Sequence, residues 1–190
     1  MRPTHRILVA AVCAVAVTAL GGCSAYNSVA SYIGSDKAEL CPDAAILATT
    51  ASLPAFDAKA GPADPSSILY TANLTFVSTR CDLDKKEHRA DARLKVYYEA
   101  TRSPGGGEAT YKVPYFVAIS NEGNISAKKL YWLTITFENG AISTKGEDTV
   151  DSTVVKAAKG KEPAEYRLVV GFQLTQAQLD YNKKIGQYVQ

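Results

Sequence analysis

The side chains best suited to chemistry gather in one short charged stretch. Residues 82–89 read DLDKKEHR and hold His88 together with three carboxylates, Asp82, Asp84 and Glu87. Such a set could surround a cation. We favour the interpretation that this stretch is a solvated hairpin tip, which needs the same charges to stay soluble. A histidine at a hairpin tip is also poorly placed to act as a base beside a nucleophile.

Motifs for other chemistries do not occur in the sequence. It contains neither the nucleophile elbow of hydrolases, nor the histidine pair of zinc proteases, nor a glycine-rich phosphate loop. The run Gly105–Gly107 lacks the lysine and the strand-to-helix setting of a phosphate loop, so we expect a flexible connection there. Most Asp and Glu residues fall in expected turns, which makes hydrolysis by paired carboxylates a weak hypothesis. We therefore expect no catalytic residue, no metal site and no cofactor.

The N-terminus has the three parts of a secretion leader. Met1–Arg6 is basic, and Ile7–Leu20 is an uncharged apolar run of 14 residues, shorter than the roughly 20 residues of a transmembrane helix. The segment that follows, Leu20-Gly21-Gly22-Cys23, resembles the lipobox of bacterial lipoproteins. An ordinary secreted protein with a free thiol is the alternative interpretation.

The lipobox resemblance implies a membrane anchor. In that family residues 1–22 are removed, the Cys23 thiol receives a diacylglycerol and the new amine is usually acylated. Two or more acyl chains form a durable anchor. Ser24, in place of Asp after the cysteine, implies sorting to the outer membrane with the domain in the periplasm; the inner membrane is the alternative. Residues 23–40, rich in Ser and Ala, are then expected to form a flexible tether.

Two cysteines remain once the lipoprotein resemblance is accepted. Cys13 leaves with the leader and Cys23 is acylated, so Cys41 and Cys81 are left in an oxidising compartment. There we expect them to form one disulfide. A metal or redox pair is the alternative, but no C-x-x-C spacing supports it.

Beyond Cys41, apolar and polar side chains alternate with a period of two. We expect Tyr70, Ala72, Leu74 and Phe76 to share one face of a strand and Val77 to lie on the other. Ala44–Leu53 is expected to pair antiparallel with the strand that contains these residues, and residues 141–156 to supply one or two more strands. The five clearest alternating segments are Ile68–Cys81, Ala92–Ala100, Tyr111–Ile119, Leu130–Glu138 and Glu165–Leu174.

The turn signals complete the expected fold. Asn139-Gly140 is expected at the centre of a hairpin, and residues 121–124 at another turn. We therefore expect an all-β, antiparallel, immunoglobulin-like β-sandwich of about seven strands over residues 41–174, with a barrel as the alternative. Thr175 and Gln178 match a capping box, which predicts an amphipathic C-terminal helix over residues 175–190.

The chain after the leader also resembles uncharacterised envelope lipoproteins of alphaproteobacteria. The resemblance rests on Cys41-Pro42 with the following Ala45–Ala48, on Tyr115–Ala118, and on Gly171–Leu174 before Tyr181-Asn182. These are structural positions, and the resemblance implies a fold and a location without an activity.

Charge and aromatic residues suggest how such a domain would act. The chain has 21 basic and 19 acidic residues, and Arg2 and Arg6 of the leader account for the difference. A balanced domain argues against nucleic acid as a partner. Phe116 and Trp132 are expected on the outer face of one sheet, where they would form a binding patch unless the C-terminal helix covers them. Lys128 and Lys129 are candidates for contact with anionic head groups, although a solvated pair explains them as well.

The sequence thus favours a non-enzymatic envelope protein that acts by binding or assembly, with membrane contact through Cys23 and a possible protein partner. An envelope hydrolase acting on cell wall or lipid and a small-ligand carrier are the alternatives.

Overall fold

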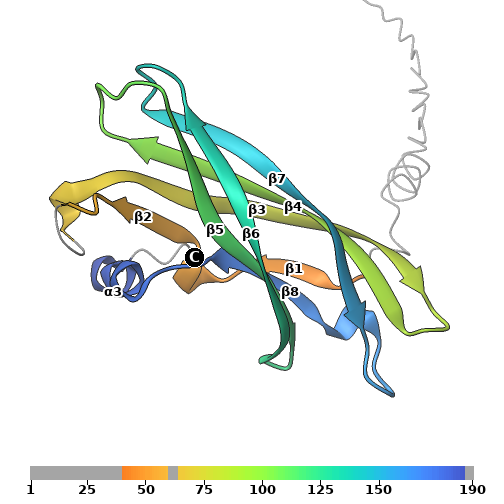
Figure 1. Cartoon of the computed structure of the whole chain (residues 1–190). Coiled ribbons are helices and arrows are strands. Elements are labelled where there is room, and N and C mark those ends of the chain that lie inside the picture. The colour runs from red at the N-terminus through yellow and green to blue at the C-terminus, as the bar shows by residue number, and fades with distance from the viewer. Residues whose placement is uncertain (1–39, 60–63, 187–190) are drawn as a thin grey trace, which may run out of the picture. The chain divides into compact units, whose positions relative to one another are not determined.

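Eight strands in the described part of the chain form two four-stranded sheets. The computed structural model describes residues 40–59 and 64–186. One sheet has the strand order β1-β8-β5-β6 and the other β2-β3-β4-β7 (Figure 1). The strands of the first sheet are β1 (Asp43–Ile46), β8 (Arg167–Phe172), β5 (Ala109–Asn121) and β6 (Asn124–Phe137). The strands of the second are β2 (Ser52–Phe56), β3 (Ile68–Asp84), β4 (Arg89–Arg102) and β7 (Ser143–Lys156).

The hydrophobic core lies between the two sheets. On β4, Leu94, Val96 and Tyr98 are buried, as the alternation predicted. Fully buried side chains from the first sheet meet them: Tyr115, Leu133, Ile135, Phe137, Leu168 and Phe172. The protein is therefore an all-β sandwich. One strand pair departs from the antiparallel prediction, because β1 runs parallel to β8.

A bulge in β3 changes which side chains reach the core. Its register against β4 shifts between Leu74 and Phe76, so that Thr75 is an extra residue. A single extra residue reverses the faces of all residues that follow it. Val77 is consequently buried and Phe76 is 58% exposed. The prediction that Phe76 shares the buried face with Leu74 is wrong for this reason.

The expected strand Ala44–Leu53 is divided between the two sheets. A 3₁₀ turn, η1 (Ala48–Thr50), separates β1 from β2. Backbone hydrogen bonds from Thr50 to Leu47 and from Ala51 to Ala48 close this turn. Of this segment only Ser52 and Leu53, at the start of β2, pair antiparallel with β3.

The disulfide therefore joins the two sheets. Cys41 directly precedes β1 in one sheet and Cys81 lies within β3 in the other, with a Cα–Cα distance of 5.8 Å. The predicted pairing of these two cysteines is confirmed. The expected antiparallel pairing of residues 44–53 with the strand before Cys81, which would also have brought the two cysteines together, is wrong in its first part, because β1 and β3 lie in different sheets.

The connections were predicted with mixed success. The Glu122-Gly123 turn has positive φ at both residues and joins β5 to β6 as a hairpin, as expected. At Asn139-Gly140 only Gly140 has a positive φ, and the turn carries the chain from β6 to β7 in the other sheet. The Arg102 guanidinium ties this connection to the glycine run by donating to the carbonyls of Ala141, Glu138 and Gly106. The expected flexible loop at Gly105–Gly107 is thus anchored at Gly106.

The C-terminal helix α3 (Gln176–Ile185) lies beside β2 and η1 (Figure 1). Its predicted capping box is present, with Thr175 as N-cap and Gln178 at the third position, and Gly186 ends it in the left-handed region. Asn182 is buried and donates to the Ser52 carbonyl at 2.8 Å, while Tyr181 packs edge-on against Phe56. Residues 187–190 of the predicted helix lie outside the described residues. None of the helices within the described ranges has the length and apolar character needed to cross a membrane.

Candidate functional site

The candidate site lies along β6, an edge strand of its sheet. Trp132 and Leu130 are 63% and 52% exposed on the outer face of this strand. Burial of such side chains is worth about 1.5–3 kcal/mol each, so two of them on successive outward positions mark a contact surface. We call Lys128, Leu130 and Trp132 the β6 face.

A proline in the neighbouring strand reveals which backbone groups of β6 are free. Pro114 of β5 is the register partner of Trp132, and its carbonyl accepts a 2.9 Å hydrogen bond from the Gln173 amide, just beyond β8. The N and C=O of one strand residue point to the same side, so Pro114 faces β8 and forms a non-hydrogen-bonded pair with Trp132. By the same alternation, the N–H and C=O groups of the β6 face point away from β5, toward the free edge.

Tyr98 closes this free edge on one side. Its hydroxyl reaches from β4 and donates a 3.0 Å hydrogen bond to the Thr134 carbonyl of β6. The ring passes over Gly146 of β7, where a Cβ would come within 2.6 Å of the hydroxyl. A glycine is therefore required at residue 146 for this contact. At the other end Ser126 is an extra residue in the pairing with β5, so the regular, open part of the edge runs from Lys128 to Trp132.

An open groove of about 420 Å³ lies between the sheets beside the same part of β6. Most of the side chains that line it are apolar, and Lys129 adds a cation. The buried Thr153 hydroxyl has no hydrogen-bond partner among the described residues. The lining residues are Val117, Ile119, Ala127, Lys128, Lys129, Tyr131, Ser152, Thr153 and Val154.

Three lysines give this region positive charge. Lys128 Nζ lies 4.3 Å above the Phe116 ring and donates to Gln173 Oε1 at 2.7 Å, and Lys129 Nζ lies 5.1 Å from the centre of the Tyr131 ring. Lys112 lies beside Trp132 on the outer face. None of the three belongs to an ion pair in the described part of the chain. Their charge is therefore available to an anionic partner.

The structure separates the two aromatic residues that the sequence placed in one patch. Phe116 is only 7% exposed. Gly171 of β8 makes room for its ring, since a Cβ at Gly171 would lie 2.9 Å from Phe116, and Lys128 lies above it. An exposed Phe116–Trp132 pair is thus wrong, and so is cover by the helix, because α3 packs on β2 and η1 and leaves Trp132 exposed. Leu130, two residues before Trp132, was overlooked although the alternation places it on the same face.

A buried tyrosine supports the strands around the groove. Tyr115 is fully buried and donates a 2.6 Å hydrogen bond to Asp148 Oδ2, which connects β5 to β7 across the core. Burial, followed by this hydrogen bond, raises the pKa of Tyr115 above the ordinary value of a phenol. Tyr131, which lines the groove, stacks on its ring at 5.5 Å.

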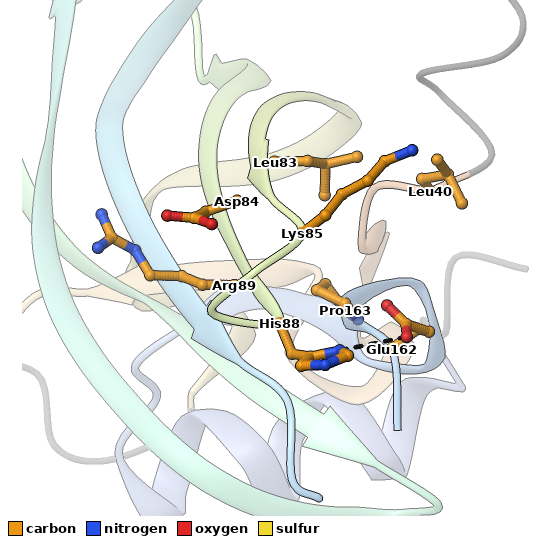
Figure 2. Close-up of a pocket in the computed structure, with 8 residues that line it drawn as sticks. All are labelled: Leu40, Leu83, Asp84, Lys85, His88, Arg89, Glu162 and Pro163. Atoms are coloured by element: carbon orange, nitrogen blue, oxygen red, sulfur yellow. Dashed lines mark ion pairs between the residues drawn. The ribbon is translucent and has the colours of Figure 1, made fainter. Parts of the chain in front are cut away.

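The charged tip that contains His88 forms a second, smaller pocket of about 220 Å³ (Figure 2). His88 Nδ1 lies 3.2 Å from Glu162 Oε1. The side chains that line this pocket include no Ser, Thr or Cys, the nucleophiles that a histidine–carboxylate pair commonly activates. Asp84 serves the turn instead, since it accepts from the amides of Lys86 and Glu87.

The described residues form no metal site, either at this tip or elsewhere. Over residues 40–59 and 64–186 no three His, Cys, Asp or Glu side chains are arranged to hold a metal ion. The carboxylates that the sequence offered as possible cation ligands, Asp82, Asp84 and Glu87, therefore do not converge on His88. Cys23 lies outside the described residues, and its lipidation stays a prediction.

No protein-family model, curated protein or solved structure matches the chain. The resemblance to envelope lipoproteins is therefore untested, and the site has to be interpreted from its own geometry.

Proposed function

We propose that this chain is a lipid-anchored envelope protein that acts by binding or assembly, and that its binding surface is the β6 face. The observation that carries the proposal is a strand edge that no described residue pairs with and whose exposed side chains include Leu130 and Trp132. Edge strands normally avoid such side chains, because they invite contact with other chains. Exposed apolar side chains on a free strand edge therefore indicate a contact surface.

The anchor half of the proposal rests on the leader and Cys23. It is tested by expressing the full chain and a Cys23→Ser variant in a bacterium that processes lipoproteins, and then separating membrane from soluble fractions. The unaltered chain is expected with the membranes, preferably the outer membrane, and the variant in the soluble fraction. Equal membrane association of both would refute the anchor.

The binding half is tested by crosslinking in intact cells. A photo-reactive amino acid replaces Trp132 in one variant and Leu69 in a matched control. Leu69 is also an exposed apolar side chain, but it lies on β3, in the other sheet. We expect a discrete protein adduct from position 132 and none from position 69. Absence of any adduct at 132, or the same adducts at both positions, would refute the β6 face as the binding surface.

One observation favours a small-ligand carrier as the second candidate. The groove beside β6 has about 420 Å³, which lies within the size range of small-molecule sites. A carrier is expected to release a small molecule of constant mass when the purified chain is unfolded. The Ala127→Trp variant, which places a large side chain at the exposed wall of the groove, should then contain none.

A further inference from the structure

We propose that the β6 edge binds an extended, acidic segment of a partner protein as an added β-strand. This inference rests on the proposed function and specifies its partner chemistry. The open edge covers Lys128–Trp132, because Tyr98 occupies the Thr134 carbonyl beyond it. About five extended residues, roughly 17 Å of chain, match that length.

The main chain of β6 provides the general attraction. Lys128, Leu130 and Trp132 each direct an N–H and a C=O to the free edge, which follows from the orientation of Pro114 in β5. An added strand satisfies these groups, as in other cases where a peptide extends a sheet.

The side chains around the edge provide selectivity. Successive residues of an added strand point to opposite faces of the sheet. One set would lie beside Leu130 and Trp132 on the outer face, and the other would point into the groove lined by Val117, Ile119 and Val154. The groove is thus placed where alternate side chains of an added strand need apolar pockets.

The lysines define the charge of the partner. Lys128 and Lys129 lie on opposite faces of the edge, and neither has an acidic partner among the described residues. Asp or Glu on the added strand would complement them. A second copy paired through its own β6 would not, because β6 contains no acidic residue and two lysines. A lipid surface is also disfavoured, because acyl chains cannot satisfy free backbone groups.

A proline at position 130 separates strand addition from contact with the outer face. The Leu130 N–H points to the free edge, so Leu130→Pro removes a hydrogen bond to the added strand and none to β5. Leu130→Ala is the matched control, because it removes the side chain and keeps the N–H. Circular dichroism and thermal unfolding check that both variants keep the fold.

The probe is a phage-displayed library of random twelve-residue peptides, panned in parallel on the full chain and both variants in mild detergent. We expect enriched peptides with apolar residues at every second position and a net negative charge. Their binding should fall roughly tenfold or more with Leu130→Pro and less than about threefold with Leu130→Ala. Lys128→Glu with Lys129→Glu should abolish the preference for acidic peptides.

Several results would overturn strand addition. One is that no peptide is enriched on the unaltered chain relative to the Leu130→Pro variant. Others are that Leu130→Pro and Leu130→Ala weaken peptide binding equally, or that the selected peptides show no preference for negative charge. A dimer that Leu130→Pro dissociates would assign the edge to a second copy, and Trp132-dependent binding to phosphatidylglycerol vesicles would assign it to lipid. The crosslink at position 132 reports independently on the proposed function. Its persistence alongside failed peptide selection refutes strand addition alone, and its absence alongside successful selection refutes the function in the envelope.

Discussion

Removal of the Cys41–Cys81 disulfide should lower the free energy of unfolding of this domain by an amount at the upper end of what single changes cost. The bond closes a loop of 40 residues. The conformational entropy that such a closure removes from the unfolded chain corresponds to about 4 kcal/mol at 25 °C. Small domains have roughly 5–15 kcal/mol in total, so the double variant Cys41→Ala/Cys81→Ala should fold with a much smaller margin.

The position of the bond shows which part of the chain it holds in place. β1 has four residues and pairs only with β8 in the described structure. The disulfide attaches the beginning of this short strand to β3 in the opposite sheet. Without it, β1 should separate from the sandwich before the rest unfolds, and its amides should exchange with solvent first.

Urea unfolding measures the effect. Far-ultraviolet circular dichroism is the suitable signal, because the single Trp132 is exposed and is expected to change little on unfolding. With a slope of about 2 kcal/mol per molar urea, the midpoint should fall by roughly 2 M. The unaltered chain in reducing agent should behave like the double variant. A loss below about 1 kcal/mol, or a reduced chain clearly more stable than the double variant, would refute the reasoning.

Three further changes test other parts of the structure. Gly146→Ala should force Tyr98 from the Thr134 carbonyl and lower the free energy of unfolding by about 1–3 kcal/mol in a urea titration. The control Gly107→Ala should be nearly neutral, because no atom lies within 4 Å of the new Cβ. Asn182→Ala should lower the free energy of unfolding by about 1–3 kcal/mol, because it removes the hydrogen bond to the buried Ser52 carbonyl. The control Asp180→Ala changes an exposed residue of the same helix and should have little effect. Thermal unfolding measures both. Burial, followed by the electrostatic interaction with Tyr111, raises the pKa of Tyr70 from 10.0 to about 12, so the folded state keeps this proton to higher pH than the unfolded state. The contribution of Tyr70 to the free energy of unfolding should be complete below pH 10 and be lost as pH rises through 12. A Tyr70→Phe variant whose alkaline unfolding curve is unchanged would contradict this.

The strand content could be read from the sequence because burial on one face imposes a period of two. The prediction was correct for Leu94, Val96 and Tyr98, because β4 itself contains no extra residue and the bulges opposite it lie in β3 and β7. It failed at Phe76, because a bulge at Thr75 leaves no distinct mark in a run of alternating residues. One extra residue was enough to exchange the buried and exposed faces.

The partition of strands between sheets was harder to predict than the strands themselves. Asn139-Gly140 favours a hairpin locally, but Arg102 fixes the surrounding carbonyls so that the chain crosses to the other sheet. The split of residues 44–53 by η1 has the same character, since Leu47 and Ala51 are ordinary strand residues. In both cases contacts from distant parts of the chain hold the path, since on either side of η1 the Leu47 N–H donates to the Val170 carbonyl and the Ala51 carbonyl accepts from the Leu74 N–H.

Half of the candidate site followed from the sequence. The alternation around Trp132 correctly placed it outside the core. Lys128 and Lys129 were candidates from the sequence, but their position at the groove beside β6 is known only from the structure. Burial of Phe116 depends on the space above Gly171, and closure of the edge depends on Tyr98, which is 36 residues away from Thr134. Neither arrangement has a local signal.

Amide hydrogen exchange along β6 tests the central claim most directly. In the free chain the account predicts an alternating pattern, with fast exchange at Lys128, Leu130 and Trp132, whose N–H groups face the open edge, and slow exchange at Lys129, Tyr131 and Leu133, which pair with β5. Addition of a selected acidic peptide should slow the three fast amides and leave the other three unchanged. Uniform protection along β6 in the free chain, or no change at the fast amides when the peptide binds, would contradict it.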